Sequence, residues 1–221
     1  MQLTDQQKQQ MGPLITTEHF TLQTARSATI SDANGRSSLF LSTVSSSLVA
    51  LAFTGQIDTS MSLFFLFALV LFPALIFLGI VTFARVLQSA IEDTIYARAI
   101  NRLRHLYVEM APQIADYFLL STNDDAASTL RNEGIAPGRW QMFLTTAGMI
   151  GVINSVLIGV FAGLVAGFSR VLLPACIVAG VAVFAISMLL HLRYQLRRWM
   201  QAESRLPVMF PGSSQRNENA V

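Results

Sequence analysis

Charge is scarce in this sequence. Only 13% of its 221 residues are Asp, Glu, Lys or Arg, whereas about one quarter of the residues in soluble domains are charged. Each of four stretches without charge reaches the roughly 20 mostly apolar residues that a bilayer-spanning helix needs. The scarcity excludes an ordinary soluble domain and predicts a membrane protein. The four stretches are about 37–57, 61–83, 141–168 and 171–192.

Cysteine and catalytic motifs are also scarce. The single cysteine, Cys176, excludes an intramolecular disulfide framework and is typical of a small core residue. The sequence contains no HExxH, CxxC or GxSxG motif and no glycine-rich phosphate loop. His105 and Glu109, four residues apart, are interpreted as a solvated helix contact rather than metal ligands. We therefore expect no catalytic residue, no metal site and no cofactor.

The apolar stretches predict an all-α integral membrane protein with four transmembrane helices. These form two antiparallel hairpins, with a helical cytoplasmic insert between the second and third spans. The alternative has three spans, because the first stretch is rich in serine and could lie on the membrane surface. No charge lies within a span, which argues against a proton relay, voltage sensor or ion-coupled transporter. The predicted segments are an N-terminal segment (1–36), a hairpin (37–83), the insert (84–140), a second hairpin (141–192), and a basic juxtamembrane helix with a disordered tail (193–221).

Arginine is concentrated in the N-terminal segment, the insert and the tail. Positive residues near span ends stay cytoplasmic, so both termini and the insert are expected in the cytoplasm of a cell (plasma) membrane protein. The sequence pI of about 9.0 then reflects topology and not nucleic-acid binding. Basic and aromatic residues flanking the spans are the expected lipid-headgroup contacts. These residues are Trp140, Arg193, Arg197, Arg198 and Trp199.

The segments outside the spans carry helix and turn signals. A short helix is expected within 18–33, ending at the turn signal Asn34-Gly35. The second span is expected to continue as a helical stalk to Met110, with an apolar stripe that must be buried. Residues 113–120, the N-terminal helix and the stalk of a second protomer are the alternatives for burying it.

Polar residues within the insert have local interpretations. We expect Ser121 or Thr122 to cap a short helix that ends before Gly134. Asp124-Asp125 is interpreted as a turn. Charged residues on the stalk are expected to form salt bridges along the stalk itself, from Glu92 and Asp93 to Arg98 and Arg102.

Small residues recur at every fourth position of the third span, which is typical of closely packed membrane helices. A four-residue step drifts by about 40° on a helix that turns about 100° per residue. The ridge should therefore have two contact surfaces: its second half against the fourth span, and its first half against another span or protomer. The ridge consists of Ala147, Gly151, Ser155, Gly159, Gly163 and Gly167.

Hydroxyl and amide side chains within the predicted spans are the remaining candidates for a function. The candidate pore-lining residues are Ser38, Ser42, Ser45 and Asn154, although such residues commonly bond within the helix bundle. We expect a non-catalytic membrane anchor, scaffold or sensor that recruits a cytoplasmic partner through the insert. The alternative is an oligomeric channel or membrane-perturbing effector. In the order of elements over 18–192, the chain resembles small effector modules of bacterial conflict systems, which implies that second function. Lipid bilayer and a homo-oligomeric assembly are the other expected partners.

Overall fold

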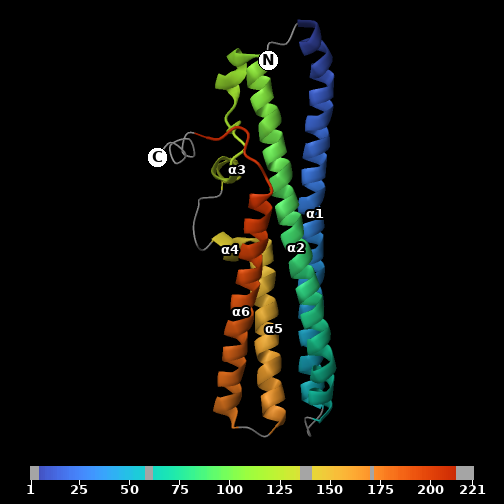
Figure 1. The fold of residues 1–221 in the computed structure, drawn as a ribbon. Helices are drawn as coiled ribbons and strands as arrows, with labels where there is room; N and C mark the ends of the chain where they lie inside the picture. Colours follow the sequence, from blue (N-terminus) through green and yellow to red (C-terminus); the bar gives the residue numbers. More distant parts are fainter. Residues whose placement is uncertain (1–4, 58–61, 135–140, 170–171, 213–221) are drawn as a thin grey trace, which may run out of the picture. The chain divides into compact units, whose positions relative to one another are not determined.

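The computed structural model describes residues 5–57, 62–134, 141–169 and 172–212, and regular structure in these ranges is helical throughout (Figure 1). Four long helices are each long and apolar enough to cross a membrane. The all-α class and four helices of spanning length are therefore confirmed. The helices are α1 (Asp5–Ile57), α2 (Ser62–Met110), α3 (Ala126–Asn132), α4 (Gln141–Leu144), α5 (Thr146–Phe168) and α6 (Leu173–Ser204), with a 3-10 helix, η1 (Pro112–Tyr117), after α2.

The N-terminal segment differs from the expected short helix. α1 is continuous from Asp5 to Ile57 and passes through Asn34-Gly35 without a turn. An ion pair of 2.8 Å between Asp32 and Arg36 crosses this point on the helix surface. Glycine inside a helix costs only about 1 kcal/mol, so contacts on both sides can keep the segment helical. A dipeptide turn signal is too weak to stop a helix that is supported on each side.

The stalk of α2 behaves as its apolar periodicity indicates. The helix continues to Met110 and ends before Ala111-Pro112. The N-terminal part of α1, one of the three segments expected to bury the apolar stripe of the stalk, contacts it. The rings of His19 on α1 and Tyr107 on α2 lie 6.0 Å apart. Ala97 and Ile100 on the stalk are buried.

The chain divides into two compact units. Unit 1 consists of Met1–Ser31, Ser89–Gln141 and Gln201–Val221, and unit 2 consists of Asp32–Gln88 and Met142–Met200. Unit 1 therefore groups parts of the N-terminal segment, the insert and the tail. Unit 2 contains the four apolar stretches.

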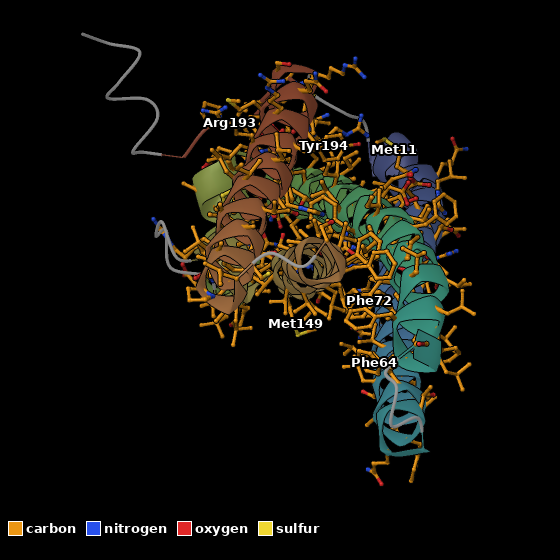
Figure 2. The ribbon with its side chains drawn as sticks, turned by 90° about the horizontal axis from the view of Figure 1, so that it is seen from below. Met11, Phe64, Phe72, Met149, Arg193 and Tyr194 are labelled. Carbon is orange, nitrogen blue, oxygen red and sulfur yellow. The ribbon has the colours of Figure 1, made fainter. Side chains whose placement is uncertain are left out.

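Unit 2 is held together by close helix contacts and aromatic pairs. Phe72 on α2 stacks with Phe161 on α5, with ring centroids 5.9 Å apart, and points from α2 toward α5 in Figure 2. Gly55 on α1 lies against the ring of Phe64 on α2. α5 and α6 lie side by side (Figure 1). They run in opposite directions, because Gly159 meets Gly180 whereas Gly163, one turn later on α5, meets Cys176, one turn earlier on α6.

Candidate functional site

Three parts of the chain meet in unit 1 at Arg26. The Nε atom of Arg26 on α1 donates to Asp93 on α2 at 2.8 Å, and one of its terminal nitrogens donates to Glu133, after α3, at 2.5 Å. Burial and the nearby Asp93 carboxylate raise the pKa of Glu133, despite the opposing effect of Arg26. This network joins the N-terminal helix to both halves of the insert.

A pocket of about 430 Å³ lies beside this network, lined by residues of α1, α2 and the α3 region. Its polar lining includes Arg26, Arg104 and Glu133, and Ile100 and Leu120 belong to its apolar lining. Arg104 lies outside the apolar stretches. Burial and the proximity of Arg26 lower the pKa of Arg104. The pocket therefore combines an apolar surface with cationic groups.

Two asparagines fix the geometry of the pocket. The amide nitrogen of Asn132 donates to Asn101 Oδ1 at 3.1 Å and to the carbonyl of Ser121 at 2.9 Å. Asn101 in turn donates to the carbonyl of Asn123 at 3.0 Å. These bonds tie the loop after η1 to both α2 and α3. Asn101 and Asn132 therefore line the pocket with fixed hydrogen-bond partners.

Asp124 and Asp125 hold the C-terminal segment 205–212. Both carboxylates are fully buried. Asp124 accepts hydrogen bonds from the backbone nitrogen of Phe210 at 2.7 Å and from Nε of Arg102 at 2.6 Å. Asp125 accepts from the backbone nitrogen of Gly212 at 2.9 Å. This aspartate pair is more than the turn that we expected, because it joins the insert to the tail.

Hydrogen bonding also sets the pKa of the aspartate pair. Burial alone would raise the pKa of Asp124, but bonds from Met209, Phe210 and Arg102 outweigh burial and lower it. The pKa of Asp125 is lowered in the same way by Ser128 and Gly212. Both carboxylates are therefore stabilised in the charged form that accepts these bonds.

One local expectation for the insert is wrong, and another is confirmed. Asp125, rather than Ser121 or Thr122, caps α3, because its carboxylate accepts from the backbone nitrogen of Ser128 at 2.9 Å. The helix does end before Gly134, which adopts the left-handed conformation with φ of 71°. The spacing Asp125-x-x-Ser128 carried the capping signal.

Three of the residues expected to form salt bridges along the stalk pair instead with residues far from them in the sequence. Arg98 pairs with Glu203 near the end of α6, and Arg102 pairs with Asp124 in the insert. Asp93 pairs with Arg26, as described above. Sequence spacing could not find these partners, because they lie between 22 and 105 residues away.

His105 and Glu109 lie 3.7 Å apart. The ring of His105 also stacks on Phe210 of the C-terminal segment, with centroids 3.9 Å apart. Within the described ranges, no group of three or more His, Cys, Asp or Glu side chains has the arrangement of a metal site.

The candidate pore-lining residues differ in their exposure within the chain. Ser38, Ser42 and Ser45 are exposed on α1, whereas Asn154 on α5 is fully buried. Asn154 packs so closely on Gly79 of α2 that a Cβ atom at Gly79 would lie 2.2 Å from Asn154 Oδ1. The amide of Asn154 therefore belongs to a helix interface within unit 2.

A buried polar cluster in unit 2 was not foreseen. Ser187 on α6 donates to the hydroxyl of Ser155 on α5 at 3.0 Å. Nδ1 of His191 lies 2.9 Å from the carbonyl of Ser187. The His191 ring packs edge-on against the ring of Phe83, with centroids 4.8 Å apart. The four-residue spacing of Ser187 and His191 was the available signal. The cluster joins α5 and α6 by polar contacts and contacts α2 through the ring of Phe83.

The small-residue ridge of α5 has contacts on two helices. A Cβ atom at Gly159 or Gly163 would meet the backbone of α6, and one at Gly167 would lie 3.9 Å from the sulfur of Cys176. Gly151 faces Phe83 of α2 and His191 of α6. Ala147 is also buried. The first half of the ridge therefore touches α2 and α6, and the second half touches α6.

The candidate headgroup residues lie on the last turns of α6. Arg193, Arg197 and Arg198 are exposed, and Trp199 is half-buried. Arg193 projects from α6 in Figure 2. Trp140 lies outside the described residues.

These observations define an all-helical protein with four helices that are long and apolar enough to cross a membrane, together with an ion-paired unit that contains a pocket. Comparison with protein-family models, with curated proteins and with solved structures gives no match.

Proposed function

We propose that this chain is a non-catalytic, multi-pass membrane protein that acts as an anchor, scaffold or sensor through unit 1. The observation that carries the proposal is the joining of the N-terminal helix, the insert and the tail by Arg26, Arg98 and Arg102. Such a unit, built from segments outside the apolar stretches, offers a fixed surface to a cytoplasmic partner.

In this proposal the four apolar helices form two antiparallel transmembrane hairpins. Contacts between Gly159 and Gly180 support the second hairpin, and the contact of Gly55 with Phe64 supports the first. Both termini and the insert lie in the cytoplasm, because arginine is concentrated in these segments. The host membrane in this proposal is the cell membrane. In this proposal the chain also forms a homo-oligomer and contacts the lipid bilayer.

An exposed apolar site on the insert is the proposed contact for the cytoplasmic partner. The side chains of Tyr117 and Leu119 are 85% and 98% exposed. A photo-crosslinking residue at Tyr117 of the full chain in its own membrane is expected to give one discrete adduct. Leu119→Ser should weaken that adduct several-fold, because it removes apolar contact area.

The same crosslinking residue at Arg131, which is exposed on α3, is the control and should give no such adduct. Mass spectrometry then identifies the adduct as a second copy of the chain or as another protein. A full chain that gives no discrete adduct from position 117 would contradict the proposal.

An oligomeric channel is the second candidate function. The exposed hydroxyls of Ser38, Ser42 and Ser45 on the apolar part of α1 favour it, because several protomers could bring such faces together around water. Ser42→Leu combined with Ser45→Leu is expected to abolish ion flux from purified protein in liposomes. A wild-type protein that conducts no ions would rule the channel out.

A further inference from the structure

Arg104 differs from the other buried and half-buried arginines of unit 1. Arg26, Arg98 and Arg102 each have a carboxylate partner. Among the described residues, Arg104 forms no ion pair, and its side chain donates one hydrogen bond of 3.3 Å, to Asn101 Oδ1. Most of its guanidinium donors are therefore available to the pocket that it lines.

An unbalanced cation is costly in this position. Taking a charge out of water is unfavourable unless the charge is paired and hydrogen-bonded. Burial, and after it repulsion from the nearby cation Arg26, lower the pKa of Arg104. A bound anion would offset both effects, and a planar guanidinium binds carboxylate or phosphate through two parallel hydrogen bonds.

The volume of the pocket and the residues that line it indicate which class of ligand could bind there. The pocket of about 430 Å³ falls within the roughly 300–1,000 Å³ typical of small-molecule sites. Ile30, Ala97, Ile100 and Leu120 provide apolar lining. Arg26 is balanced by Asp93 and Glu133, so among the described residues Arg104 is the cation of the lining that has no carboxylate partner. These features suit a molecule with one oxyanion group and an apolar body.

We propose that this pocket binds a small molecule through a carboxylate or phosphate group held by Arg104, with the apolar part of the ligand against Ile100 and Leu120. The inference rests on the sensor role proposed for unit 1 and names the chemistry of its ligand. A soluble molecule and a lipid headgroup are two sources of the same oxyanion.

The test uses the full chain in phosphatidylcholine nanodiscs, with benzoate and phenyl phosphate as probes and benzyl alcohol as the neutral control. At least one of the two anions is expected to raise the Tm and to bind in calorimetry, and benzyl alcohol is not. Arg104→Gln should weaken binding at least tenfold, because it removes a charge-assisted bidentate contact. The affinity of Arg104→Lys for the anion should lie between those of the wild type and Arg104→Gln, because lysine keeps the positive charge but lacks the planar guanidinium.

Arg131→Gln is the matched control, because it makes the same change at an exposed arginine of α3 that does not line the pocket. Without ligand, Arg104→Gln should leave the Tm unchanged or raised, since it removes an unpaired cation. A lower Tm without ligand would assign Arg104 a structural role and overturn the proposal. Equal loss of binding in Arg131→Gln would also overturn it.

A second arm distinguishes the source of the anion. In this arm, phosphatidylglycerol is added to the nanodisc and no soluble probe is present. If the ligand is a soluble molecule, the lipid should change the Tm of the wild type and of Arg104→Gln by the same amount. A rise that depends on Arg104 would instead support the oxyanion site and assign it to a lipid headgroup. No Arg104-dependent binding of either anion or of the lipid, up to millimolar concentration, would overturn the inference. Crosslinking at Tyr117 would still test the proposed function independently.

Discussion

Asp124→Asn is expected to detach the C-terminal segment 205–212 from the insert. The wild-type carboxylate is fully buried and accepts from the backbone nitrogens of Met209 and Phe210 as well as from Arg102. An amide replaces one acceptor oxygen with a donor that faces donors. Because a hydrogen bond to a charged group contributes about 1.5–3 kcal/mol, we expect docking to weaken by about 2–4 kcal/mol.

Amide hydrogen exchange measures this effect directly. The backbone amides of Met209 and Phe210 should exchange on the order of a hundredfold faster in the variant, because local opening controls exchange. Asp116→Asn is the matched control, since Asp116 is exposed on η1. Unchanged protection of both amides in Asp124→Asn would show that the carboxylate does not hold the segment.

The same docking has a predictable pH dependence. The pKa of Asp124 is lower in the folded chain than its ordinary value of 3.8. Its stabilising contribution is therefore fully present above that ordinary value, and it is lost as the pH falls through the folded value. Protection of Met209 and Phe210 should stay constant at neutral pH and decline only below about pH 4. Asp124→Asn should lack this acid transition.

Gly159→Ala is expected to force α5 and α6 apart. A Cβ atom there would lie 2.8 Å from the carbonyl oxygen of Gly180 and 2.8 Å from Cβ of Phe184. Backbone carbonyl and Cβ atoms cannot rotate away, so the helices must separate. Overpacking of this kind costs about 1–3 kcal/mol. We expect a lower Tm in detergent and a smaller free energy of unfolding.

Gly167→Ala is the internal control for this prediction. It makes the same change on the same ridge of α5, but among the described residues the added atom would meet only the sulfur of Cys176, at the ordinary distance of 3.9 Å. The control should be neutral or slightly stabilising, because alanine favours helix over glycine. Equal Tm values for Gly159→Ala and Gly167→Ala would contradict the close approach of the two helices.

Local patterns predicted the parts of this fold that depend on neighbouring residues. The uncharged stretches correspond to long apolar helices, and the stalk periodicity led correctly to a helix that ends at Met110. The turn signal at Asn34-Gly35 failed, because a dipeptide preference is smaller than the support that α1 receives on both sides. Asp125 was missed as a cap, although its spacing to Ser128 carried the signal.

The pocket residues could not be found in this way. Arg26 and Arg104 appeared in the sequence as charges outside the spans, and nothing near either residue indicates that both line one pocket. Asp124 appeared as part of a polar turn, because its partners Met209 and Phe210 follow more than 80 residues later. Side chains so far apart in the chain meet only when the helices that carry them pack together.

The sequence by itself determined the class of this protein, because the distribution of apolar and charged residues sets which helices can enter a bilayer. Only the tertiary structure decided which charges are neutralised. It paired Arg26, Arg98 and Arg102 with distant carboxylates and left Arg104 without one among the described residues. The physical reason is that Coulomb attraction and desolvation depend on distance in space, whereas helix formation depends mainly on neighbours along the chain.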